Sequence, residues 1–264
     1  MRLPLSVAMI SFNEEHVIRR TLTAVRELAA EIIVVDSHST DATREIAAEL
    51  GARVFEEDWK GHIAQKSSAL AKCTEPWILS LDCDEVVSPE LAAAIVRAVR
   101  DPDADGYMVN RRTIYLGRAL KHMWQPDWKL RLVRRDASPA WGGYDPHDSL
   151  SIRGEVRKLR PGVLDHYSYA DLNDHFTRLV GYARIAASSY HERGQRAGLG
   201  KLLFSPVAGV LKSYVLRGGF LDGMPGLIAA GSKYVYVLLK YCFLWELDHP
   251  GSRRPSRDGK ETPR

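Results

Sequence analysis

Residues 78–85, ILSLDCDE, decide the fold. A short apolar run from Trp77 to Leu81 is typical of a buried strand, and Asp82, Asp84 and Glu85 follow it directly. Two aspartates one residue apart at the end of a buried strand suit a divalent cation that protein oxygens share with substrate phosphates. The same triplet is also explained by a turn in which one carboxylate caps the next helix. The surrounding chain therefore has to decide between the two interpretations.

The chain before this strand alternates short apolar runs with longer amphipathic segments. The pattern predicts strands over residues 5–12, 32–35 and 52–55, and helices over residues 15–29, 39–50 and 63–73. Ser88-Pro89-Glu90 predicts the start of another helix, with a capping side chain and a proline in the first turn. Such alternation is typical of strand and helix units that build a mostly parallel sheet. Ligands bind such sheets at the carboxyl ends of the strands.

The pattern changes after residue 100. Residues 107–115 and 128–134 are predicted to be strands, and residues 172–190 are predicted to form a helix. Residues 193–245 contain a single acidic side chain, Asp222, among many apolar and several basic ones. No stretch there reaches the roughly 18 uncharged apolar residues that a membrane-spanning helix needs, so we expect an amphipathic helical segment. The tail from residue 249 has a composition typical of disorder.

Composition excludes several classes of protein. With 264 residues, 45% hydrophobic and 27% charged, the chain is not disordered, collagen-like or a coiled coil. Three cysteines without C-x-x-C spacing support neither a disulfide framework nor a zinc knuckle and favour a reducing cytoplasm. The absence of a G-x-G-x-x-G after the first strand, and of a Walker lysine, argues against dinucleotide redox chemistry and ATP hydrolysis. Glu14 and Glu15 favour a first strand over a signal peptide.

Charge is unevenly distributed along the chain. The net charge is +4, but residues 1–100 carry 11 basic and 16 acidic side chains, whereas residues 191–264 carry 12 basic and 6 acidic ones. A basic C-terminal part predicts an anionic partner or surface there. No helical reading motif or basic groove supports nucleic acid as that partner.

Four motifs in order now give a more specific interpretation. They are SFNE at residues 11–14, IVVDS at 33–37 followed by STD at 39–41, QK at 65–66 and ILSLDCDE at 78–85. Together they resemble the nucleotide-sugar half of glycosyltransferase family 2, which has the GT-A fold. Later motifs resemble the branch of bacterial lipopolysaccharide core β-glucosyltransferases: PD at 126–127, RLVRR at 131–135, PHD at 146–148, DHY at 165–167 and GFLDG at 219–223. The resemblance covers nearly all of the chain except the tail.

The resemblance implies an α/β fold and a domain organisation. We expect a GT-A catalytic domain, a mixed Rossmann-like sheet flanked by helices, over residues 1–190. Its nucleotide-sugar half would span residues 1–100 and its acceptor half residues 101–190. Residues 191–248 would form a helical, membrane-associating extension, and residues 249–264 a disordered tail.

The resemblance also implies the residues that bind the donor. Asp36 would accept a hydrogen bond from the uracil ring of a UDP-sugar, and Lys66 would offset the charge of the diphosphate. Phe12 would offer an aromatic face to the base, although a core position explains it equally well. For Lys66 the alternative is a solvated lysine on a helix face, which is the commoner fate of such a residue. The remaining donor contacts implied are Ser11, Asn13, Glu14 and Asp82.

The metal and the catalytic base follow from the same resemblance. Asp84, with Asp82 and His166, would bind Mg²⁺ or Mn²⁺, and imidazole suits Mn²⁺ better. Asp148 matches the catalytic base. The branch commonly has His-Glu where this chain has His147-Asp148, so the carboxylate here is one methylene shorter.

Phosphate and acceptor contacts are the least specific part of the resemblance. His147 would orient Asp148 or contact the acceptor. Arg131 would bind phosphate, with a solvated basic strand as the alternative.

The activity implied is inverting, metal-dependent transfer of a hexose from a UDP-sugar to the inner core of lipopolysaccharide or a related lipid-linked glycan. The alternatives are a transferase of the same fold with a protein or exopolysaccharide acceptor, and a non-catalytic nucleotide-sugar-binding protein. We expect a cytoplasmic protein, peripheral on the inner face of the cytoplasmic membrane. For the basic C-terminal segment, packing on the core or a dimer contact is the alternative to lipid binding. The sequence does not indicate an oligomeric state.

Overall fold

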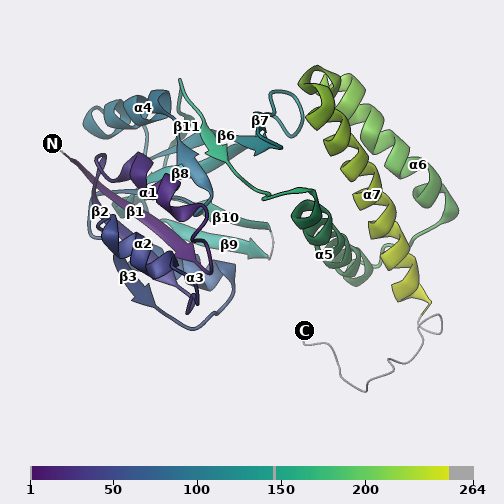
Figure 1. The fold of residues 1–264 in the computed structure, drawn as a ribbon, viewed down its shortest axis with the longest axis horizontal. Helices are drawn as coiled ribbons and strands as arrows, with labels where there is room; N and C mark the ends of the chain where they lie inside the picture. The colour runs from purple at the N-terminus through teal and green to yellow at the C-terminus, as the bar shows by residue number, and fades with distance from the viewer. Residues whose placement is uncertain (1, 145–146, 250–264) are drawn as a thin grey trace. The chain divides into compact units, whose positions relative to one another are not determined.

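The computed structural model describes residues 2–144 and 147–249, without the side chains of Tyr144 and His147. The proposed disordered tail, apart from residue 249, therefore lies outside the described residues. The chain divides into two compact units (Figure 1). The first comprises residues 1–119 and 125–168, and the second comprises residues 120–124 and 169–264.

The first unit is built on one mixed sheet. In the sheet the strands run in the order β3-β2-β1-β4-β8-β6-β12-β5, and β7 and β11 also pair with β6. The first four of these run parallel, and β8 lies antiparallel between β4 and β6. The strands of this sheet are β1 (Leu3–Ser11), β2 (Ala29–Asp36), β3 (Arg53–Glu56), β4 (Trp77–Ser80), β5 (Glu85–Val87), β6 (Gly106–Tyr115), β7 (Arg118–Ala119), β8 (Trp128–Arg134), β11 (Val156–Lys158) and β12 (Leu164–His166).

Helices cover both faces of the sheet because its central strands are apolar on both sides. Leu5, Val7 and Met9 of β1 pack against α1 (Ile18–Val25) and α4 (Pro89–Arg100). On the opposite face, Ala8 belongs to a second core cluster with residues of α3 (His62–Ala71) and of the hairpin of β9 (Ala140–Tyr144) and β10 (His147–Ser151). Helix α2 (Thr43–Glu49) connects β2 to β3. The predicted α/β architecture, a mixed sheet of the GT-A type flanked by helices, is confirmed.

Ser88 fixes the start of α4, as its capping position predicts. Its hydroxyl oxygen accepts hydrogen bonds from the backbone N–H groups of Leu91 and Val163, both at 3.2 Å. Its own N–H donates to the carbonyl of Val163 at 3.1 Å. One side chain therefore joins the helix to the chain that enters β12.

Six strands, β5, β7, β9, β10, β11 and β12, were not predicted from the sequence, and two of them matter for the site. Strands β5 and β12 have three residues each and pair antiparallel, with His166 opposite Glu85. A three-residue strand gives too little periodicity to be recognised. Their pairing nevertheless brings the DHY motif beside the D-x-D triplet.

The second unit is helical. It contains α5 (Leu172–Glu192), α6 (Leu199–Val210) with a π-helical continuation over Leu211–Leu216, a 3₁₀ turn over Gly219–Asp222, and α7 (Gly223–Asp248). The Asp222 carboxylate accepts hydrogen bonds from the backbone N–H groups of residues 121, 122 and 123, at 2.7–3.0 Å. These bonds hold residues 120–124 in this unit and lower the pKa of Asp222 against the opposing effect of burial.

The unit boundary differs from the predicted domain boundary. The resemblance placed the 172–190 helix in the catalytic domain, and in the structure α5 groups with the helical unit. Periodicity identifies a helix but does not say which neighbour covers it. The sequence indicated that no stretch of this region could span a membrane, but two helices of this unit, Leu199–Leu216 and Gly219–Asp248, are long and apolar enough to do so, by length and composition only.

We predict that Ser88→Ala lowers the free energy of unfolding by about 1–2 kcal/mol, because it removes a helix cap and one further hydrogen bond. Urea titration followed by circular dichroism measures the change. Ser88→Thr keeps the hydroxyl and is the matched control. Equal stability of Ser88→Ala and the wild type would contradict the role given to this side chain.

Candidate active site

Hydrogen bonds join the loops that follow β1 and β2. The N–H of Asn13 donates to the Ser39 hydroxyl at 2.8 Å, and the Asn13 side-chain oxygen accepts from the N–H of Thr40 at 2.8 Å. The N–H of Glu14 donates to the hydroxyl of Thr43 at 2.7 Å. Asn13 has a φ of +55°, in the left-handed region that asparagine tolerates better than most residues. The SFNE motif therefore forms a turn fixed against the STD motif, at the carboxyl edge of the sheet.

Phe12 and Asp36, at this edge of the sheet, differ in solvent exposure. Phe12 is 56% exposed, which excludes the core position that the sequence left open and leaves its ring accessible to a ligand. Asp36 is fully buried, and its carboxylate accepts hydrogen bonds from the Ser11 hydroxyl at 2.7 Å and the Ser39 N–H at 2.7 Å. In this structure Asp36 thus organises the loop, and no part of it is accessible to a base.

Lys66, on α3, connects two of the predicted site carboxylates. Its ammonium lies 2.9 Å from an Asp82 oxygen and 2.8 Å from an Asp148 oxygen. It also lies 4.5 Å from the centroid of the Trp141 ring. Its side chain is only 11% exposed, so it is not the solvated surface lysine that a helix face would suggest. The structure therefore brings together side chains from α3, the end of β4 and β10.

Electrostatics keep the Lys66 ammonium charged. Burial alone would lower the pKa of Lys66, but Asp82 and Asp148 outweigh it and raise the pKa above the usual lysine value. The pKa of Asp82 is held far below its usual value, because Arg131 and Lys66 outweigh the opposing effect of burial. Both groups are therefore ionised at neutral pH.

Arg131 and Glu85 extend the same chain of charges into the core. Arg131 is 4% exposed and donates to an Asp82 oxygen at 2.8 Å and to a Glu85 oxygen at 2.6 Å. Arg111 contacts the same Glu85 oxygen at 3.4 Å and binds Asp127 at 2.8 Å. The other Glu85 oxygen accepts from the N–H of Asp82 at 3.1 Å. Glu85 therefore fixes the D-x-D turn, directly through the N–H of Asp82 and indirectly through Arg131.

The place of Arg131 differs from both sequence interpretations. It is neither on a solvated face nor exposed to a phosphate, because its guanidinium is buried between two carboxylates. Sequence reasoning also missed the role of Glu85, the third carboxylate of DCDE. A charged residue directly after a buried strand can be recognised as part of a buried ion pair only if the residue that pairs with it is also known. That partner is 46 residues away.

Asp84 and His166 form a second cluster. The Nε2 atom of His166 lies 3.2 Å from an Asp84 oxygen, and the Ser168 hydroxyl lies 2.7 Å from the Nδ1 atom of His166. Two adjacent ligands of an octahedral cation, each about 2.1 Å from the metal, stand about 3.0 Å apart. The spacing and the mixed oxygen and nitrogen donors therefore fit two ligand positions of a divalent cation.

The remaining ligands would come from elsewhere. Among residues 2–144 and 147–249, no group of three or more His, Cys, Asp or Glu side chains could hold a metal by itself. Both Asp82 oxygens are already paired with Lys66 and Arg131. The side chain of His147 lies outside the described residues.

A parallel strand edge with an organised pair of loops and buried carboxylates is typical of the sites of nucleotide-diphospho-sugar transferases. The family model for glycosyl transferase family 2 matches residues 6–154. The lipopolysaccharide core biosynthesis glycosyltransferase LpsC of Rhizobium meliloti is 30% identical over 97% of both chains. This chain belongs to glycosyltransferase family 2 and is a glycosyltransferase.

Other comparisons are more distant. An uncharacterized glycosyltransferase of Rickettsia typhi is 28% identical over 85% of this chain and 80% of its own length. Among solved structures, a mannosyltransferase of Pyrobaculum calidifontis with GDP-mannose and Mn²⁺ has a TM-score of 0.49 and 14% identity, covering 96% of this chain and 89% of its own.

We predict that Arg131→Met destabilises the protein by about 3–5 kcal/mol, because it leaves the Asp82 and Glu85 carboxylates without their common partner. Arg134→Met is the control on the same strand. It breaks an exposed pair with Asp136 and should cost less than about 1 kcal/mol. Urea unfolding of both variants measures the difference. Similar losses in the two variants would contradict the central position of Arg131.

Proposed function

We propose that this chain is an inverting, metal-dependent enzyme that transfers a hexose from a UDP-sugar to the inner core of lipopolysaccharide. The observation that carries the proposal is the Lys66 bridge between Asp82, at the strand edge where the donor would bind, and Asp148, the predicted base. The similarity to LpsC along 97% of both chains supports the acceptor class.

The donor would bind at the carboxyl ends of β1, β2 and β4. The exposed ring of Phe12 is available to stack on the uracil, and the Asn13 turn borders the same edge. Lys66 has three N–H groups, of which two point to carboxylates, so one is left for a phosphate oxygen. Asp84 and His166 would hold a Mg²⁺ or Mn²⁺ ion, which when bound offsets charge on the diphosphate.

Asp148 would act as the general base. Its carboxylate oxygen removes the proton from an acceptor hydroxyl while the hydroxyl oxygen forms a bond to the anomeric carbon. The bond between that carbon and the diphosphate oxygen breaks, and UDP leaves with the electron pair. Attack from the side opposite the diphosphate inverts the configuration, and no covalent intermediate is required.

Lys66 would couple donor binding to this step. A phosphate oxygen at the third N–H of Lys66 would share the charge of the ammonium, so a bound donor would weaken the attraction between Lys66 and Asp148. Asp148 would then be held less tightly by Lys66 and could turn to the acceptor hydroxyl.

The helical unit would place the enzyme on the inner face of the cytoplasmic membrane. On α6 and its continuation, Leu199, Phe204 and Leu216 are 72–81% exposed, and Lys201 and Lys212 lie on the same helix. An apolar face with basic residues is typical of helices that lie in a membrane interface and attract anionic lipids. A lipid-linked glycan acceptor would be presented there.

Asp148→Asn should lower the transfer rate by at least 100-fold while the UDP dissociation constant changes by less than about threefold, because only the proton acceptor is lost. Calorimetry with UDP and Mn²⁺ measures affinity, and release of UDP with extracted core oligosaccharide measures transfer. Asp148→Glu, which restores the residue common in the branch, should keep measurable activity. Parallel losses of affinity and transfer in Asp148→Asn would instead assign this residue a structural role.

Asp84→Ala and His166→Ala should each raise the Mn²⁺ concentration needed for half-maximal UDP release by at least tenfold, since each removes one metal ligand. Asp136→Ala removes an exposed carboxylate away from the site and serves as the control. Metal activation of Asp84→Ala that matches the wild type would exclude Asp84 as a ligand.

Replacing Leu203 and Phe204 by glutamate should release the protein from vesicles that contain anionic lipid, because two charges then enter the apolar face. Co-sedimentation with such vesicles measures binding. Val156→Glu, at an exposed apolar position of the first unit, is the control and should still bind. Unchanged sedimentation of the double variant would contradict an interfacial role for α6.

A further inference from the structure

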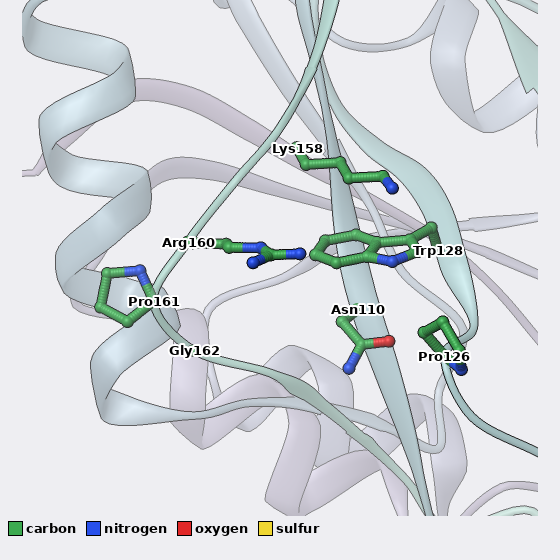
Figure 2. Close-up of a pocket in the computed structure, with 7 residues that line it drawn as sticks. All are labelled: Asn110, Pro126, Trp128, Lys158, Arg160, Pro161 and Gly162. Carbon is green, nitrogen blue, oxygen red and sulfur yellow. The ribbon is translucent and has the colours of Figure 1, made fainter. Parts of the chain in front are cut away.

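A cleft of about 530 Å³ opens on the first unit, beside strands β6, β8 and β11 (Figure 2). None of the predicted site residues lines it. Its lining residues are Asn110, Pro126, Trp128, Lys158, Arg160, Pro161 and Gly162. In the view of Figure 2, Lys158 and Asn110 lie on opposite sides of the Trp128 indole.

Two cations share the single aromatic ring of this cleft. The Lys158 ammonium lies 4.9 Å and the Arg160 guanidinium 5.1 Å from the Trp128 ring centroid. Both side chains are exposed, and neither has a carboxylate partner within residues 2–144 and 147–249. Arg157, on the same strand, is by contrast paired with Asp103 and Glu155. Two unpaired cations next to one ring favour an anionic ligand.

The cleft is linked to the active-site charges through neighbouring residues. The Asn110 side-chain oxygen accepts a hydrogen bond from the N–H of Asp127 at 3.1 Å. The Asp127 carboxylate binds Arg111, which contacts the buried Glu85. The cleft residue Asn110 thus precedes Arg111 in the sequence, and the cleft residue Trp128 follows Asp127. This places the cleft on the β6 and β8 side of the sheet, away from the β1 and β2 ends where a nucleotide would bind.

The backbone on one side of the cleft is held rigidly. Gly162 has a φ of +110°, and a Cβ atom there would stand 2.2 Å from the backbone nitrogen of Leu91. The Val163 N–H and carbonyl are both bonded to Ser88. A fixed backbone next to two exposed basic side chains fits a preformed subsite.

We propose that this cleft is an acceptor subsite that binds a sugar carrying a carboxylate or a phosphate. The sugar ring would pack on the indole of Trp128, and its anionic group would bind Lys158 and Arg160. The inference rests on the proposed function and deepens it, because it makes the acceptor an acidic glycan and separates the residues that recognise it from those that bind the donor.

The test measures transfer to lipopolysaccharide core oligosaccharide in three forms: untreated, carboxyl-reduced and dephosphorylated. Lys158→Gln and Arg160→Gln should each raise the KM for the untreated acceptor about tenfold with little change in kcat, as loss of one charge-assisted contact predicts. The effect should disappear with whichever treated acceptor lacks the recognised anion, which also tells a carboxylate from a phosphate. Arg157→Gln removes the same charge from the same strand and should leave KM unchanged.

The alternatives give different results. If the wild type transfers sugar but Lys158→Gln and Arg160→Gln keep its KM for all three acceptors, the subsite is overturned and the proposed function stands. If the variants lose binding to anionic vesicles while KM is unchanged, the cleft binds lipid headgroups and the proposal is again wrong. No transfer by the wild type to any of the three acceptors overturns the proposed function and the subsite together.

Discussion

A lysine ammonium held between two carboxylates is the interaction on which the site depends. Lys66 joins Asp82 to Asp148, and Arg131 and Arg111 continue the alternation of charge through Glu85 to Asp127. These residues come from helix α3, from strands β5, β6, β8 and β10, and from the loops that follow β4 and precede β8. Because these charges are mostly buried, each must lie within ion-pair distance of its partner, and this fixes the relative positions of the helix and strands that carry them.

This series of ion pairs contributes more to the geometry of the site than to the stability of the fold. Removing charges from water costs several kcal/mol per ion, and their mutual attraction offsets this only when the partners are well placed. An apolar core of the same volume would hold the sheet together equally well. The charges therefore fit a functional requirement: they position Asp82 and Asp148, and they leave one Lys66 N–H group without a carboxylate partner, which the proposed function assigns to a phosphate.

Much of this arrangement could be predicted from local sequence. The strands β1, β2 and β4, the cap at Ser88 and the loop residues around Asn13 follow from periodicity and turn chemistry. The motif resemblance correctly indicated the family. What could not be predicted depends on distant pairing. Strand β12 brings His166 to Asp84, and Arg131 turns inward because Glu85 lies in the core beneath it. No local pattern encodes either contact.

A double-mutant cycle on Lys66 and Asp148 tests the central claim most directly. Urea unfolding of wild type, Lys66→Met, Asp148→Asn and the double variant gives the coupling free energy of the two side chains. The account predicts a coupling of about 1–3 kcal/mol without ligand and a smaller value at saturating UDP, because a diphosphate on the third N–H then shares the charge of the ammonium. A coupling near zero without ligand, or one that UDP leaves unchanged, would contradict it.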